Sequence, residues 1–412
     1  MPPNSDPFEL LRQGRGTRLM QCKRCLWPGC VCDEGRDFGL EFLTVPLGTM
    51  LAAKVSTWGN CEGLIKMKKY RQKMWSLAVG CLLAVASSGT LAESICSLPL
   101  PPQVVSLSNG VKKNLSPQPR AIPRVHSEGT LPHEGIWDAS VEARRDWPLM
   151  RQLAQLWRAK HRAEDAQALS RIMTEWARVY QPSFNPIDET GLDAYIDAYV
   201  IAHDALDAST QTAAQDFIRV LAEGYLQRME AVVRPRASWL NNWQSHRIKL
   251  AVLGAAALND QALWSRARTA FVAHLGRNIR SDGSTLDFEE RDALHYVVYD
   301  LEPLVRAAMV AQQRGESWLN LSDKGGGSLI KALDWLVPYA VGEKTHEEFV
   351  NSRVAFDAKR NSAGLRGFSG TWEPKKAASL FAMAATLDER YAPIAQQLNP
   401  SGYLLVTCWQ GR

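Results

Sequence analysis

From Trp137 onward the sequence predicts an all-α fold, an (α/α) toroid or incomplete barrel of paired antiparallel helices. Apolar residues recur at three- and four-residue spacing, as amphipathic helices require. We find no convincing run of alternating apolar and polar residues of the kind that predicts a half-buried strand. About ten helices follow one another in one unit, which favours helix pairs arranged in a ring or a solenoid.

Proline, glycine and asparagine residues that interrupt helices separate the predicted elements. The expected helices cover residues 140–160, 162–180, 189–207, 210–231, 241–257, 260–274, 287–313, 327–338, 343–358 and 374–394. The interruptions fall at Pro182, Pro186, Pro235, Asn259, Gly283, Gly325 to Gly327 and Gly364 to Gly370.

The interior of the sequence contains the layout of a secretory signal peptide. Residues 67–73 are basic, residues 74–86 are apolar and uncharged, and small residues lead to a cleavage site after Ala92. The apolar run is short for a permanent membrane anchor. Because a signal peptide acts at the start of a chain, we expect translation to begin at Met67. The expected organisation is a wrongly assigned extension (1–66), a signal peptide (67–92), an irregular arm rich in Pro, Ser and Val (93–135), a helical domain (136–400) and a C-terminal tail (401–412).

The cysteines leave two questions open. Four of them have metal-ligand spacing and could hold a zinc ion in a small N-terminal module; these are Cys22, Cys25, Cys30 and Cys32. A zinc module ahead of an export signal makes little cellular sense, so the extension is the preferred interpretation. Cys96 and Cys408 remain after cleavage, and they could form one disulfide in an oxidising compartment or stay as two thiols.

Charge argues against a nucleic-acid partner. The whole chain carries a formal net charge of +5, but residues 93–412 contain 36 Lys and Arg against 36 Asp and Glu. The exported part is therefore formally neutral, and binding of an anionic ligand would need a local cluster of cations. We expect a periplasmic or secreted bacterial protein that is a monomer without a stable membrane anchor after cleavage.

Two segments carry polar side chains at helical spacing. In the first, Asn242 and His246 share a helix face, and Lys249 lies one turn further on. An asparagine at a helix start can also be a simple N-cap. In the second, Arg291, His295 and Tyr299 form one stripe. A neighbouring stripe contains Asp292, Tyr296 and Tyr299. A salt-bridged helix with buried tyrosine rings would produce the same pattern.

Taken together, the two segments resemble the alginate lyase superfamily of polysaccharide lyases, over roughly residues 137–395. Asn241 and Asn242 match one family motif, and Ala293 to Tyr296 match a second at nearly the family's separation. Arg280 to Ser284 resemble the family's Asp-Gly turn, and the stretch from Phe184 to Glu189, which includes Asn185, lies where the family has a cleft loop.

Two departures from the family pattern indicate a divergent branch, similar to mannuronan or glucuronan lyases. The family's histidine after the two asparagines is Trp243 here, and His246 is the nearest replacement. The family's arginine on the second motif falls on Glu289, and Arg291 is the nearest substitute.

The resemblance implies β-elimination on a polyuronate without a metal or another cofactor. Asn242 would donate its amide to the substrate carboxylate, with Arg291 or protonated His246 supplying positive charge. Tyr296 would take the proton from carbon 5 as a phenolate and return it to the leaving oxygen as a phenol. An ordinary phenol titrates near 10, so Arg291 and His246 would have to lower the pKa of Tyr296. The expected substrate-binding residues are Asn241, Trp243, His295, Tyr299, Lys249, Asn185, Arg366 and Trp372.

Two other functions stay open at this point. A glycoside hydrolase of similar fold would need a pair of separated carboxylates, and Asp138 or Asp188 could contribute. A non-catalytic protein that binds exopolysaccharide would also fit the helix pattern. For the segment with Arg366 and Trp372, a plain connector is as reasonable as a cleft loop. The polymer, whether alginate, polymannuronate or glucuronan, and the choice between internal and terminal cleavage cannot be read from the sequence.

Overall fold

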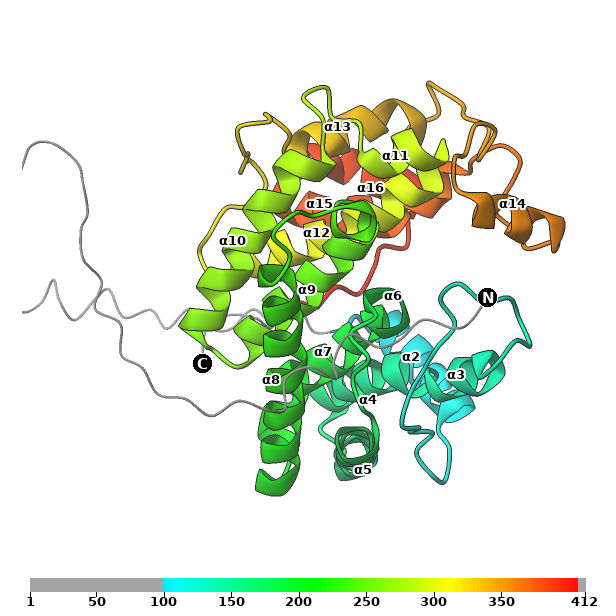
Figure 1. The fold of residues 1–412 in the computed structure, drawn as a ribbon. Helices are drawn as coiled ribbons and strands as arrows, with labels where there is room; N and C mark the ends of the chain where they lie inside the picture. The colour runs from blue at the N-terminus through cyan, green and yellow to red at the C-terminus, as the bar shows by residue number, and fades with distance from the viewer. Residues whose placement is uncertain (1–98, 407–412) are drawn as a thin grey trace, which may run out of the picture. The chain divides into compact units, whose positions relative to one another are not determined.

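The computed structural model describes residues 99–406. The predicted extension and signal peptide lie outside the described residues, as do Cys96 and Cys408. The described residues form helices and loops with two isolated β-bridges and no strand, which confirms the all-α prediction (Figure 1). None of the described helices is long and apolar enough to cross a bilayer.

Fifteen α-helices follow one another along the described residues. They are α2 (Pro101–Asn114), α3 (Trp137–Ala143), α4 (Asp146–Lys160), α5 (Ala163–Val179), α6 (Pro186–Glu189), α7 (Asp193–Ala202), α8 (Ala208–Glu230), α9 (Asn242–Ala257), α10 (Gln261–Asn278), α11 (Leu286–Arg291), α12 (Leu294–Gln313), α13 (Leu329–Ala340), α14 (Ala355–Ser362), α15 (Ala378–Leu387) and α16 (Ala392–Leu398).

Helix α9 is the central element of the fold. It packs against α7 and α8 on the N-terminal side and against α10 and α12 on the C-terminal side (Figure 1). Almost all of its residues are buried, including the polar side chains of Asn242, His246 and Lys249. A helix that is enclosed on all sides must pair its polar groups inside the protein. The polar residues of α9 therefore mark where the two halves of the fold are joined.

The predicted irregular arm contains a helix, so that prediction is wrong for Pro101–Asn114. Two prolines occupy the first turn, where their missing N–H groups cost nothing. The Gln103 side chain accepts a hydrogen bond from the Leu100 N–H at 2.8 Å. Helix α2 packs against α4, and this packing stabilises a segment whose own apolar pattern is weak.

The predicted helix 287–313 is broken in two at Asp292. This residue has a left-handed backbone with φ of 49° and ends α11. Its main-chain oxygen accepts from Phe349 N at 2.8 Å, and its carboxylate accepts from Asn351 N at 2.9 Å. Helix α12 then begins with the buried Glu348 accepting from Leu294 N at 2.7 Å. These contacts also explain why the predicted helix 343–358 is a loop as far as residue 354.

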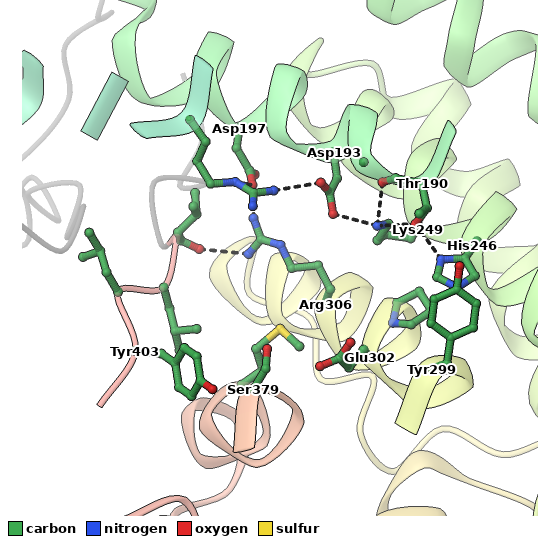
Figure 2. A pocket seen from close by; sticks show the side chains of 17 residues that line it. Thr190, Asp193, Asp197, His246, Lys249, Tyr299, Glu302, Arg306, Ser379 and Tyr403 are labelled. Carbon is green, nitrogen blue, oxygen red and sulfur yellow. Dashed lines mark hydrogen bonds and ion pairs between the residues drawn. The ribbon is translucent and has the colours of Figure 1, made fainter. Parts of the chain in front are cut away.

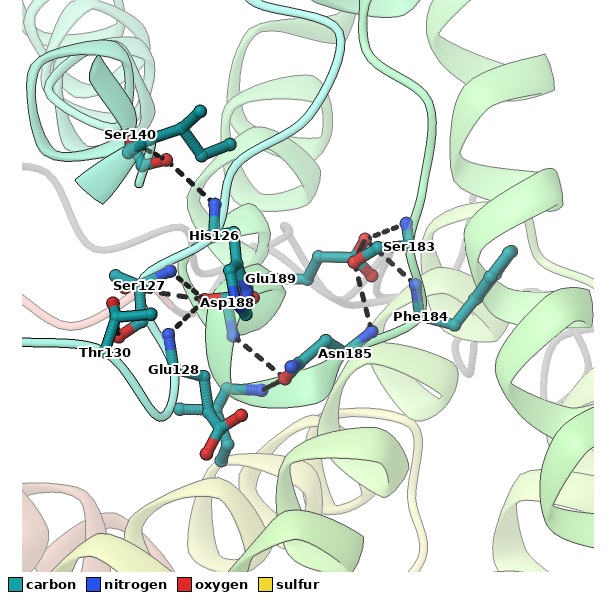
Figure 3. Close-up of polar contacts among 12 residues, drawn as sticks. His126, Ser127, Glu128, Thr130, Ser140, Ser183, Phe184, Asn185, Asp188 and Glu189 are labelled. Carbon is teal, nitrogen blue, oxygen red and sulfur yellow. Dashed lines mark hydrogen bonds and ion pairs between the residues drawn. The ribbon is translucent and has the colours of Figure 1, made fainter. Parts of the chain in front are cut away.

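A buried carboxylate fixes the turn between α5 and α6. Glu189 is fully buried and accepts hydrogen bonds from the hydroxyls of Tyr180 at 2.9 Å and Tyr225 at 2.5 Å. It also accepts from the backbone N–H groups of Ser183 and Phe184 (Figure 3). Burial raises the pKa of Glu189, and these donors counteract that effect. One side chain thus pairs donors from the stretch after α5 and from α8.

Replacing Glu189 with alanine should lower the free energy of unfolding by about 2–5 kcal/mol, because several buried donors would lose their acceptor. Denaturant titration measures this change. Glu164→Ala, at an exposed position on α5, is the control and should stay within about 0.5 kcal/mol of the parent. Equal stability of the two variants would show that the Glu189 contacts contribute little.

Candidate functional site

The predicted proton-transfer residue Tyr296 lies at the start of α12 under two guanidinium groups. Arg360, from α14, donates to the Tyr296 hydroxyl at 2.9 Å. Arg291, from the end of α11, lies over the Tyr296 ring at 3.8 Å from its centroid. Buried Asp357 pairs with both arginines and so holds α14 against α11. The Tyr296 hydroxyl is therefore beside concentrated positive charge.

The break at Asp292 changes the predicted stripe without dispersing it. Arg291 does not share a helix with His295 and Tyr299, yet the turn returns its side chain to the Tyr296 ring. His295 and Tyr296 lie with ring centroids 5.2 Å apart, and His295 stacks on Tyr299 at 6.4 Å. Arg291, His295, Tyr296 and Tyr299 therefore lie together as predicted, but Arg291 reaches the others through the turn at Asp292 and not through a shared helix.

His246 extends this cluster across to the other half of the fold. Its ring lies 4.3 Å from the ring of Tyr299, and its Nδ1 is 2.6 Å from the Thr190 hydroxyl. Lys249 donates to the same hydroxyl at 2.9 Å and to Asp193 at 2.6 Å. Burial and the charge of Lys249 lower the pKa of His246 well below its ordinary value. A neutral His246 cannot supply the positive charge that the sequence analysis assigned to it as one option.

Burial shifts the pKa values of the two groups at the centre of the cluster, Tyr296 and His295. Burial raises the pKa of Tyr296 despite the opposing charges of Arg291 and Arg360. The expectation that positive charge lowers this pKa below 10 is therefore wrong, since burial outweighs the arginines. Burial lowers the pKa of His295 to about 4, with Lys376 and both arginines adding to the effect. At neutral pH the site holds a neutral phenol beside a neutral imidazole.

Asn242 is not placed as the sequence analysis expects. It is 1% exposed, and both its backbone N–H and its side-chain amide donate to the carboxylate of buried Asp287. Its neighbour Asn241 is the N-cap of α9, with its oxygen accepting from Trp243 N at 3.3 Å. In this arrangement Asn242 joins α9 to α11 instead of donating to a ligand.

Replacing Asn242 with alanine should therefore lower stability by about 1–3 kcal/mol, because Asp287 would lose a buried donor. Thermal unfolding and steady-state kinetics on the same preparation check this. A variant with unchanged stability and a large loss of kcat would instead show that Asn242 contacts substrate directly.

The remaining predicted binding residues lie in varied surroundings. Trp243 is half-buried beside Arg247, with the guanidinium 5.9 Å from the ring. Asn185 is the N-cap of α6, where its side chain accepts from Ile187 N and Asp188 N. Arg366 is exposed on the loop after α14. Trp372 is only 5% exposed and packs in the hydrophobic core, so the prediction that it reaches substrate is wrong in this structure.

Asp188 and Asp138, the carboxylates considered for a glycoside hydrolase, are each bound by neighbouring groups. Asp188 is 1% exposed and accepts from the backbone N–H groups of Ser127 and Glu128 and from the His126 ring (Figure 3). Asp138 is exposed and pairs with His133 at 3.0 Å. The first holds the arm to α6, and the second belongs to a surface pair.

A pocket of about 410 Å³ adjoins the cluster (Figure 2). His246 and Tyr299 line one side of it, and the C-terminal segment Tyr403–Val406 lines the opposite side. Helix α7 with Asp193 and Asp197 faces α12 with Glu302 and Arg306 across the space. Three residues of the candidate site, His246, Lys249 and Tyr299, therefore also form the wall of a ligand-sized pocket.

Comparison with known proteins decides the family. Residues 104–346 match the alginate lyase family.

The chain belongs to the alginate lyase family.

A polysaccharide lyase from Stenotrophomonas maltophilia is 30% identical over 129 residues, which cover 31% of this chain and 38% of that protein. The aligned region thus spans well under half of that relative. An alginate lyase from Bacteroides ovatus has a similar fold, with a TM-score of 0.56, 16% identity and coverage of 72% of this chain and 89% of its own. This likeness confirms the predicted toroid of helix pairs.

Two arginines near the cluster in this alginate lyase family member, Arg360 and Arg144, were not predicted from the sequence. Arg360 lies just beyond the predicted helix 343–358, and nothing in its local pattern indicates a partner 64 residues earlier. Arg144 follows α3, and its Nε donates to the Ser140 carbonyl at 3.3 Å. It pairs with no carboxylate among residues 99–406, although it is half-buried. Its charge favours the phenolate form of Tyr299, so it lies near the cluster from the opposite half of the fold.

No group of three or more metal-binding side chains occurs in the described part of this family member. Metal independence stays a prediction.

Proposed function

We propose that this protein is a polysaccharide lyase that cleaves a polyuronate by β-elimination, with alginate rich in mannuronate as the first candidate substrate and glucuronan as the second. The observation that carries the proposal is the Tyr296 hydroxyl held by Arg360, beside Arg291 and His295, in a chain of the alginate lyase family. Family membership supports lyase chemistry, and the arginines provide the charge that an anionic substrate requires.

The elimination requires a stabilised carboxylate, a base and an acid. Removing the proton from carbon 5 places negative charge on the adjacent carboxylate, and guanidinium groups stabilise that charge through paired donors. Arg144, Arg291 and Arg360 are the candidates, and Arg144 is the one that pairs with no acid in the described residues.

Neutral His295 and neutral Tyr296 suit the two proton transfers. The His295 imidazole is unprotonated at neutral pH because burial depresses its pKa to about 4, so it can accept the carbon 5 proton. Tyr296 receives a hydrogen bond from Arg360, which leaves its own O–H free to protonate the leaving oxygen. The elimination then forms the double bond between carbons 4 and 5. In this proposal His295 is the base and Tyr296 is the acid, whereas the prediction from the sequence gave both roles to Tyr296.

Incubation of the protein with polymannuronate, polyguluronate and glucuronan, each alone, tests the proposal. Ultraviolet absorbance of the conjugated double bond should rise with a preferred polymer, because only elimination creates that group. New reducing ends without this absorbance would indicate hydrolysis. Polymer binding without either product would indicate a non-catalytic binding protein.

Arg144→Gln should raise KM for the preferred polymer by about tenfold, the value of one charged hydrogen bond of about 1.5 kcal/mol, with a smaller change in kcat. Arg145→Gln is the matched control, because the neighbouring Arg145 is exposed and pairs with Glu142. Equal KM values for the two variants would remove Arg144 from the binding site.

Acting on an extracellular polymer would require export. We propose a periplasmic or secreted location for the mature chain, supported by the signal-peptide layout of residues 67–92. N-terminal sequencing of the protein from the culture fluid or periplasm should find a start next to Ala92, and a start at Met1 would contradict this proposal.

A further inference from the structure

The pocket beside the cluster is bounded at its far side by the chain's own C-terminal segment. Tyr403 to Val406 cross the pocket opposite His246 and Tyr299 (Figure 2). Along α12, Tyr299, Glu302 and Arg306 line the route from the cluster to that segment. Seven residues of helix separate the first from the last, a rise of about 10 Å. The space is therefore a short passage that begins at the site and ends at the tail.

The segment is held in place by Arg306 of α12 and by the burial of Val406. Arg306 Nη1 donates to the Val406 carbonyl at 3.0 Å, and Arg306 Nη2 donates to Asp197 on α7 at 2.6 Å. Val406 is 7% exposed and belongs to the hydrophobic core, with Leu405 packed against it. Opening of the tail would remove the main-chain oxygen that Arg306 binds and would expose Val406 to solvent, so these contacts favour the closed position.

Three cations and three carboxylates line the passage. Arg151, Lys249 and Arg306 are the cations, and all three pair with Asp193 or Asp197. The third of these acids, Glu302, is half-buried, and loss of solvation raises its pKa. Uronate units carry one carboxylate each, and these three cations are the groups on the wall with which such a carboxylate could pair.

A polymer that is cut internally must extend past the catalytic groups in both directions, whereas a passage closed at one end admits only a terminus. We propose that Tyr403–Val406 closes the substrate cleft and that the enzyme removes short products from the end of a polyuronate chain. This inference rests on the proposed lyase function, and it adds the position of the cut and the residues that set it.

Product analysis of the full chain on the preferred polymer tests the inference. Small unsaturated products should appear from the first time points, while solution viscosity falls slowly relative to the ultraviolet absorbance. An early loss of viscosity with a broad ladder of oligomers would show internal cleavage and overturn the inference, although the lyase function would stand. Absence of ultraviolet absorbance with every polymer tested would overturn the lyase function and this inference with it.

Two truncations test the assignment to the tail. A chain ending at Gly402 lacks the closing segment and should shift the initial products from small to long oligomers, with a faster loss of viscosity. A chain ending at Val406 keeps the segment and is the matched control, which should give the products of the full chain. A folded Gly402 variant, checked by its melting temperature, that still releases only small products would overturn the assignment. If that variant does not fold, the product profile of the full chain still decides whether cleavage is terminal.

Discussion

Replacing Tyr296 with phenylalanine should reduce kcat by about a hundredfold to ten-thousandfold, the usual range for loss of a positioned proton donor. The change removes only the hydroxyl that Arg360 contacts and leaves the ring under Arg291. KM should change little, since the arginines that attract the polymer remain. Initial rates of ultraviolet absorbance over a range of polymer concentrations separate kcat from KM.

Tyr391→Phe is the matched control for this experiment. Tyr391 is also buried, and its hydroxyl lies 2.8 Å from the Asp334 carboxylate. Loss of that hydroxyl should change stability but not kcat. A Tyr296 variant that keeps parental kcat would mean that another group protonates the leaving oxygen.

Replacing Arg360 with glutamine should lower kcat by about tenfold to a hundredfold, corresponding to the roughly 1.5–3 kcal/mol of a charged hydrogen bond. The positive charge of Arg360 opposes the effect of burial and lowers the pKa of Tyr296. Without it, the pKa of Tyr296 rises further above its ordinary value. When Tyr296 acts as the acid, the alkaline limb of the kcat profile should therefore move to higher pH, and Arg360→Lys should restore part of the shift.

Lys359→Gln removes a neighbouring positive charge from the same helix and serves as the control. Lys359 is exposed and lies over the Phe356 ring, so its loss should leave both kcat and the pH profile unchanged. An alkaline limb that stays in place in Arg360→Gln would show that this limb does not report on Tyr296.

Local spacing was enough to find most of the cluster. His295, Tyr296 and Tyr299 share a helix, and any helix places residues three and four positions apart on one face. His246 and Lys249 are three positions apart on α9, so their spacing alone predicted that they share a face. The Asp282 to Gly283 turn was also visible, since Gly283 has a positive φ of 95° that favours glycine.

Residues joined across the fold could not be found in this way. Asn242 matched a family motif, but its backbone N–H and side-chain amide donate to the buried carboxylate of Asp287, 45 residues later. The helix break at Asp292 depends on Glu348 and Phe349, which no pattern around Asp292 indicates. Burial of Tyr296 likewise results from packing between elements, and it reverses the expected direction of the pKa shift.

The sequence by itself determined the helical class, the family resemblance and the polar faces of α9 and α12, because these depend on the order and spacing of neighbouring residues. Only the tertiary structure decided which charges surround Tyr296 and what closes the pocket. Arg360 and the tail reach the site from segments far along the chain. Hydrogen bonds, desolvation and closure depend on distances in space, and the packing of the whole helical ring sets those distances.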